Sequence, residues 1–233
     1  AIIDGRTGDV IINPKEHTLA KYRELQKQLT THIKNLEHCG NLKAETIDGY
    51  TVSLSANIEM CNDLDILHEY GSDGIGLFRS EYICLSSDTF PTEEEQFAAY
   101  KNIVDEMKGL PVVIRTFDIG GDKFHQSIQD VDEESNPFLG CRAIRLLLKR
   151  PDIFKTQLRA ILRASAFGPI KIMFPMISGL PELKEAKEMI YHVQQELHAE
   201  GLSPDENIKI GCMIVVPSAA ITCDLLAKEC DFL

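Results

Sequence analysis

Apolar residues along the chain follow two alternating patterns. Short, nearly continuous apolar runs are separated by longer segments in which apolar residues recur every three or four positions. Runs of the first kind are typical of buried parallel strands, and segments of the second kind are typical of amphipathic helices. We therefore expect five strands and the start of a sixth, at residues 52–58, 74–78, 112–116, 170–176, 208–216 and 231–233. Helices are expected at residues 64–70, from 92 onward, and at 140–149, 153–166, 180–200 and 219–228.

The first 40 residues lack this alternation. Residues 4–8 indicate a turn, and residues 10–14 indicate a short strand that ends at a proline. Residues 17–38 are polar and free of turn residues, and their apolar side chains are spaced by three and four positions. This spacing predicts a single amphipathic helix that precedes the alternating region.

Strands that alternate with helices predict an α/β fold with a parallel sheet. The Rossmann glycine fingerprint is missing, which favours a (β/α)8 TIM-type barrel over an open sheet. Eight strand–helix units need roughly 250 residues, so we expect a barrel that is truncated after about five and a half units. The chain opens without a methionine and closes in an apolar run, so we also expect it to be a piece of a longer protein.

Charge and composition narrow the classes of partner. The 233 residues include 24 Lys and Arg against 36 Asp and Glu, a formal net charge of −12. Nucleic-acid binding needs a basic face, so we expect no nucleic-acid partner. No apolar run approaches the ~18 residues of a membrane span and no secretory signal opens the chain, so a cytoplasmic protein without membrane contact is expected. Seven scattered cysteines indicate reduced thiols rather than zinc ligands or disulfides.

Three arginines lie at or after the ends of predicted strands, where TIM-type barrels build their active sites. The planar guanidinium fork matches the oxygens of a carboxylate or a phosphate. Arg79, Arg115 and Arg142 are therefore candidate ligands for a small anion with several charges. In the alternative interpretation, which the spacing leaves open, each arginine pairs with a neighbouring acid and fastens a loop. The acids concerned are Glu81, Asp118 and Glu134.

Six ordered sequence elements point to a known family. They are GLFRSE at 76–81, PTEEEQF at 91–97, RTFDIGGDK at 115–123, NPFLG at 136–140, RAIR at 142–145 and FPM at 174–176. Together they resemble enzyme I of the bacterial sugar phosphotransferase system, the phosphoenolpyruvate–protein phosphotransferase family, over essentially the whole chain. Pyruvate phosphate dikinase and phosphoenolpyruvate synthase share the barrel and some of these motifs. The element at 91–97 and the length of residues 15–50 resemble enzyme I more closely.

The resemblance implies a partial C-terminal phosphoenolpyruvate-binding domain. In this family a barrel binds phosphoenolpyruvate with Mg²⁺ and dimerises, and a separate domain carries the histidine that passes the phosphoryl group to the carrier protein HPr. By motif, Arg79, Arg115 and Arg142 match arginines of the phosphoenolpyruvate pocket. Residues 1–14 resemble the tail of the phosphohistidine domain, residues 15–40 a helical linker, and residues 41–233 part of the barrel.

Some family features are absent from this chain. None of its seven histidines (17, 32, 38, 68, 125, 192 and 198) lies in a phosphohistidine motif, so we expect no catalytic residue here and no activity from the chain alone. The family's strand-five motif Met-x-Glu-x-Pro, whose glutamate is a Mg²⁺ ligand, reads Met213-Ile-Val215-Val-Pro217. Valine supplies no oxygen ligand, so no metal ligand is assigned. A non-catalytic, phosphoenolpyruvate-binding or regulatory paralogue therefore remains an alternative, as does a fragment of a pyruvate phosphate dikinase-type enzyme.

Overall fold

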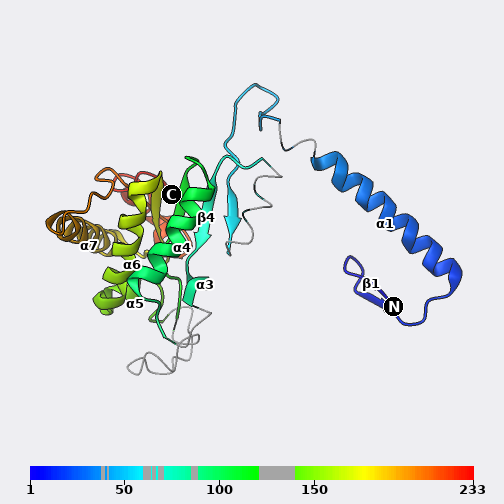
Figure 1. The fold of residues 1–233 in the computed structure, drawn as a ribbon, viewed down its shortest axis with the longest axis horizontal. Coiled ribbons are helices and arrows are strands. Elements are labelled where there is room, and N and C mark those ends of the chain that lie inside the picture. The colour runs from blue at the N-terminus through cyan, green and yellow to red at the C-terminus, as the bar shows by residue number, and fades with distance from the viewer. Residues whose placement is uncertain are drawn as a thin grey trace. The chain divides into compact units, whose positions relative to one another are not determined.

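Two compact units make up the chain (Figure 1): residues 1–52 with 68–71, and residues 53–67 with 72–233. The computed structural model describes residues 1–37, 40, 42–59, 64, 67, 71–84, 89–120 and 140–233. None of its described helices is both long enough and apolar enough to cross a membrane.

The first unit opens with a hairpin and continues into one long helix. Strand β1 (Ile2–Asp4) pairs antiparallel with β2 (Asp9–Ile11). In the turn between them, the Asp4 carboxylate accepts a hydrogen bond of 3.0 Å from the backbone N–H of Arg6. The sequence indicated only the second strand, because three residues are too few to show a pattern. Helix α1 (Glu16–Glu37) confirms the helix expected at residues 17–38.

A parallel sheet of five strands forms the centre of the second unit. The strands lie side by side in chain order: β3 (Ala56–Ile58), β4 (Ile75–Arg79), β5 (Val112–Arg115), β6 (Ile170–Phe174) and β7 (Lys209–Cys212). Phe232 forms a parallel bridge to Gly211 of β7, so the chain at this residue takes the next position in the strand order. A doubly wound sheet reverses its strand order, whereas a TIM-type barrel keeps it. The sheet therefore confirms the expected α/β class and five successive strands of a (β/α)8 barrel, with a sixth beginning.

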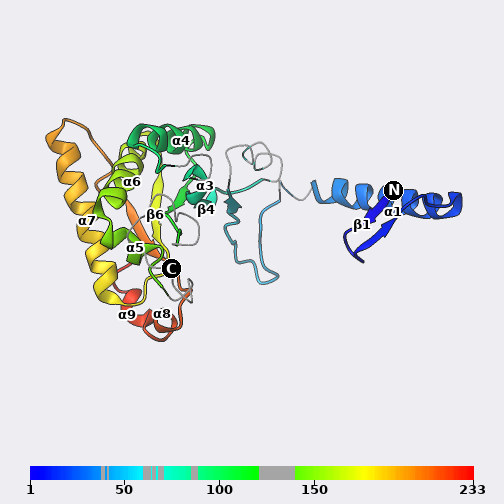
Figure 2. The same ribbon diagram turned by 90° about the horizontal axis from the view of Figure 1, so that it is seen from below.

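Helices follow the strands and cover one face of this sheet. They are α3 (Glu81–Cys84), α4 (Glu93–Glu106), α5 (Ile144–Lys149), α6 (Pro151–Ala164), α7 (Leu180–Ala199), α8 (Pro217–Ile221) and α9 (Cys223–Leu226), with a 3-10 turn at Ser165–Phe167. Figure 2 shows α6 and α7 together on one side of the strands, and α4 packs against α6. Edge-to-face ring pairs connect the two layers, at 6.2 Å between Phe78 and Tyr100 and 6.1 Å between Phe154 and Phe174. The opposite face of the sheet is its concave face, because it faces the interior of a TIM-type barrel, and it holds the alternate side chains of the strands.

Several boundaries differ from those expected. The strands expected at 52–58 and 208–216 are shorter, and α5 begins four residues later than expected because Ala143 has a positive φ of 50°. The helix expected at 219–228 is two short helices that meet at Thr222, whose φ of −107° lies outside the helical region. The helix expected at 64–70 lies outside the described residues except for Leu64 and Leu67.

An ion-pair network joins the outer surfaces of α4, α6 and α7. Arg159 contacts Glu93 of α4 at 2.6 Å and Glu200, just beyond α7, at 2.7 Å. Arg163 contacts Glu93 and Glu94, each at 2.6 Å. Hydrogen bonds from Arg163 and Arg159 lower the pKa values of Glu94 and Glu200 from their ordinary value of 4.5.

This network predicts a loss of stability in acid. A carboxyl group whose pKa is lower in the folded chain stabilises the fold above its unfolded-state pKa, and that stabilisation disappears as the pH falls through the folded-state pKa. We expect the double substitution Glu94→Gln and Glu200→Gln to destabilise the protein at pH 7. The difference from the unchanged protein should shrink as the pH is lowered from about 5 to 3, measured by urea unfolding. Glu188→Gln, on an exposed α7 position outside the network, is the control. A pH-independent difference would contradict this role of the network.

Candidate anion-binding site

Arg79 and Arg115 occupy neighbouring positions at the carboxyl ends of β4 and β5. The two are direct partners in the register of the parallel pair. Successive side chains of a strand point to opposite faces. Because Phe78 packs against Tyr100 on the helical side, Arg79 is placed on the concave face. The register then brings Arg115 onto that face beside it.

Arg115 is the most buried of the three predicted arginines, with 8% of its surface exposed. Its Nη2 donates a hydrogen bond to the carboxylate of Glu81, the first residue of α3, which is also buried. Its Nη1 lies 3.3 Å from Asp118 Oδ2. A buried guanidinium is stable only with compensating charge, and these two acids supply it.

Arg142 reaches the same cluster from the chain segment before α5. Its Nη2 lies 2.8 Å from Asp118 Oδ1, so that one carboxylate bridges Arg142 and Arg115. An antiparallel bridge between Gly120 and Arg142 and a 2.8 Å hydrogen bond from Ala143 N–H to the Ile119 carbonyl hold the two segments together. The placement of Arg142 therefore depends on backbone pairing across the loop.

Arg79 pairs with an acid that the sequence analysis did not single out. Its Nη1 lies 2.5 Å from Glu59 Oε1, and both side chains are about one-third exposed. The Tyr82 hydroxyl also donates a hydrogen bond to Glu59, which raises the pKa of Tyr82. Glu59 could have been identified from the sequence by its position, because it directly follows β3 and so lies at a strand end, as Arg79 does.

The structure brings all three predicted arginines into one cluster and also shows the acid pairing of the alternative interpretation. Glu81 and Asp118 do pair with arginines of the cluster, but Glu81 pairs with Arg115 rather than with neighbouring Arg79, and Glu134 lies outside the described residues. Three guanidinium groups and three carboxylates balance in formal charge. Buried Nε groups of Arg79 and Arg115 nevertheless have no hydrogen-bond partner in the described part of the chain. Unpaired buried donors are costly, and an anion would satisfy them.

The residues at the end of β7 do not fit a Mg²⁺ site. Val215 is half exposed there and offers no oxygen. Within the described ranges, no group of three or more His, Cys, Asp or Glu residues could hold a metal ion.

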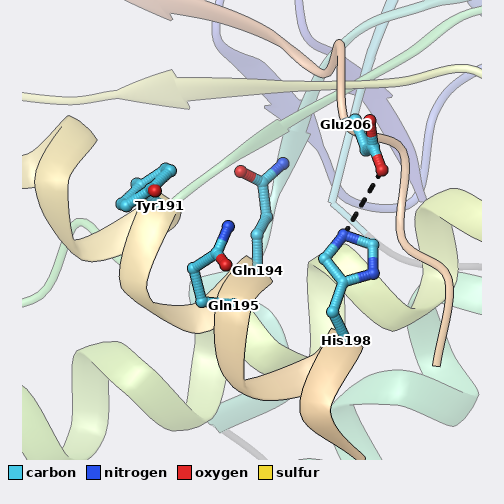
Figure 3. Close-up of a pocket in the computed structure, with 5 residues that line it drawn as sticks. All are labelled: Tyr191, Gln194, Gln195, His198 and Glu206. Atoms are coloured by element: carbon cyan, nitrogen blue, oxygen red, sulfur yellow. Dashed lines mark ion pairs between the residues drawn. The ribbon is translucent and has the colours of Figure 1, made fainter. Parts of the chain in front are cut away.

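A hollow of about 460 Å³ lies on the outer surface of α7. Figure 3 shows Tyr191, Gln194, Gln195 and His198 along this helix, with Glu206 on the following segment facing His198. His198 Nε2 lies 3.6 Å from Glu206 Oε1, an ion pair when the imidazole is protonated. The segment after α7 leads into the amino end of β7, and that end of a barrel serves stability. We therefore place the chemistry at the arginine cluster.

Comparisons with known proteins show the family of the chain. A family model described as "PEP-utilising enzyme, PEP-binding domain" matches residues 33–233. Over 231 residues, 99% of this chain, the sequence is 46% identical to a "Phosphoenolpyruvate-protein phosphotransferase" of Staphylococcus carnosus (strain TM300). Proteins with the same description from Staphylococcus aureus (strain MSSA476) and Priestia megaterium are 45% and 43% identical. The chain spans 40% of the length of each of these relatives.

Proposed function

Because this chain belongs to the PEP-utilising enzymes, whose family model covers residues 33–233, we propose that its arginine cluster binds phosphoenolpyruvate. The observation that carries the proposal is the pairing of Arg79 with Arg115 at the ends of adjacent parallel strands, with Arg142 joined to them through Asp118. Phosphoenolpyruvate has a phosphate and a carboxylate, and guanidinium groups bind both kinds of oxygen in a bidentate manner. The unpartnered Nε donors of Arg79 and Arg115 support this assignment.

The acids of the cluster have a defined part in this proposal. Glu59, Glu81 and Asp118 hold the guanidinium groups in place when no ligand is bound. An incoming phosphate or carboxylate binds the remaining N–H donors or replaces one of these carboxylates. Phosphoryl transfer requires mainly positioning and charge neutralisation, and both are functions that a fixed set of arginines can perform.

For the complete protein we propose phosphoryl transfer from phosphoenolpyruvate to a histidine of the same enzyme and then to the carrier protein HPr. This is the first step of the sugar phosphotransferase system, in the cytoplasm, and the complete enzyme is a homodimer. Residues 1–14 are assigned to the tail of the phosphohistidine domain, residues 15–40 to a helical linker, and residues 41–233 to part of the barrel. The acceptor histidine is assigned outside this chain.

The test is phosphoenolpyruvate-dependent labelling of HPr by the complete protein. With ³²P-labelled phosphoenolpyruvate, we expect label first on the enzyme and then on HPr. Binding of phosphoenolpyruvate without any transfer would instead support the non-catalytic alternative, which Val215 favours. Absence of both binding and transfer would contradict the proposed function.

Val215 provides a separate prediction about Mg²⁺. Valine lacks both the charge and the oxygen of a carboxylate, so Val215→Glu should raise the apparent Mg²⁺ affinity and the transfer rate of the complete protein, whereas Val215→Ala should change little. Titration of activity with Mg²⁺ measures both effects. Unchanged affinity and rate in Val215→Glu would show that residue 215 does not face the ligand.

A further inference from the structure

Gln157 is a polar residue within the apolar face of α6. Its neighbours along that face are Ile153, Phe154 and Ile161, and all of them are buried. Gln157 is itself fully buried, with no exposed surface. A polar side chain in such a position is costly unless every donor and acceptor is used. The hydrogen bonds of the Gln157 amide therefore indicate its structural role.

The side-chain amide of Gln157 connects the ends of two strands. Its Oε1 accepts a 3.0 Å hydrogen bond from the backbone N–H of Phe117, two residues beyond Arg115. Its Nε2 donates a 2.9 Å hydrogen bond to Ser80 Oγ, and Ser80 directly follows Arg79. Ser80 Oγ in turn donates a 2.6 Å hydrogen bond to the carbonyl of Arg115. One amide thus contacts the side chain that directly follows Arg79 and the backbone two residues after Arg115.

The same network continues away from the strand ends, toward α4. Gln157 Nε2 also lies 3.2 Å from the Tyr100 hydroxyl, which donates at 3.3 Å to Gln96 Oε1. Gln96 Nε2 donates at 2.9 Å to the Pro91 carbonyl. Every donor in this chain of bonds has an acceptor. Gln96 is nearly as buried as Gln157, but in the described part of the chain its side-chain hydrogen bonds go to Tyr100 and the Pro91 carbonyl rather than to a strand end.

We propose that Gln157 is a positioning residue for Arg79 and Arg115. From the helical side of the sheet, its amide fixes the carboxyl ends of β4 and β5 relative to each other. The positions of these strand ends determine the geometry in which the two arginines bind substrate. This rests on the proposed phosphoenolpyruvate site. Glutamine suits the role because it offers an acceptor to Phe117 and donors to Ser80 and Tyr100 in one rigid plane. Hydrogen bonds are strong in a network that is shielded from water. A displacement of about 1 Å in a substrate-binding group lowers binding or catalysis substantially.

The experiment compares Gln157→Met with Gln96→Met in the complete protein. The two substitutions remove a buried amide from the same network, and only the first breaks the connection between the strand ends. We expect Gln157→Met to weaken phosphoenolpyruvate binding about tenfold, in line with the loss of one or two buried hydrogen bonds, and Gln96→Met to weaken it less than about twofold. Binding is measured by calorimetry on protein that is shown to be folded by circular dichroism.

A double-substitution cycle distinguishes positioning from general support of the fold. If Gln157 acts through Arg115, its substitution should cost little further affinity once Arg115→Lys is present, whereas the effects of Gln96→Met and Arg115→Lys should simply multiply. The inference would be overturned if the affinity losses of Gln157→Met and Arg115→Lys also multiplied. Equal losses of affinity in the Gln157→Met and Gln96→Met variants would overturn it too. If Arg115→Lys alone leaves binding unchanged, the phosphoenolpyruvate site itself is wrong, which is a distinguishable result.

Ser80→Ala provides a smaller change if Gln157→Met does not fold. It removes only the hydroxyl between Gln157 and the Arg115 carbonyl, and we expect about threefold weaker binding. Gln96→Met is again the control and should bind within about twofold of the unchanged protein. Normal binding by Ser80→Ala would count against the proposal.

Discussion

Arg115→Met is expected to lower kcat/KM for phosphoenolpyruvate at least about hundredfold in the complete protein, which corresponds to ~2.7 kcal/mol. Arg115 is the buried arginine of the cluster; it pairs with Glu81 and Asp118, and it is the partner of Arg79 in the strand register. Methionine has a similar length but no charge and no N–H donor. The substrate therefore loses a bidentate partner in a site that is poorly screened by water.

The same substitution leaves Glu81 buried without its partner, which costs stability as well as binding. Removing one member of a buried ion pair typically costs ~3–5 kcal/mol. Arg115→Met combined with Glu81→Gln separates the two effects, since it removes the uncompensated charge but does not restore the substrate contact. Arg150→Met is the control, because Arg150 pairs with the exposed Asp152 away from the cluster. Normal kcat/KM in a folded Arg115→Met protein would show that Arg115 does not bind substrate.

The second large effect concerns the chain by itself, from which we expect no phosphoryl transfer to HPr. None of its seven histidines lies in a phosphohistidine motif, and the proposed enzyme needs such a histidine as the first acceptor. Among the histidines that the structure describes, His192 and His198 lie on α7 rather than at the arginine cluster, and His17 and His32 lie on α1 of the first unit. Without an acceptor, bound phosphoenolpyruvate has no route to the carrier.

The measurement is label transfer from ³²P-phosphoenolpyruvate to HPr with this chain as the only enzyme, and with the complete protein as the positive control. Acid-labile label on the chain would identify a histidine acceptor within it, and mass spectrometry of its peptides would locate the site. That result would contradict the assignment of the acceptor outside residues 1–233.

Local patterns were sufficient for much of the fold. Apolar runs predicted β4, β5 and β6 nearly at their observed bounds, because a strand covered by helices must be apolar along its length. The helix expected from residue 92 onward is α4, which begins directly after Thr92, and both hydrogen bonds of a capping box between Thr92 and Glu95 are present. Predictions were poorer where single backbone angles end an element, as at Ala143 and Thr222, since these angles depend on contacts outside the local sequence.

The sequence by itself indicated that Arg79 and Arg115 would lie close together, because the carboxyl ends of consecutive parallel strands face the same edge of a sheet. The place of Arg142 depends on a backbone bridge to Gly120, which only the tertiary structure shows. Only the tertiary structure decided the partners of these arginines. Glu59 pairs with Arg79 across 20 positions, and Gln157 reaches Ser80 across 77. Such contacts depend on strand register and on the rotation of α6 against the sheet. Hydrophobic periodicity indicates which face of an element is buried, but it does not indicate which polar groups from distant elements will meet there.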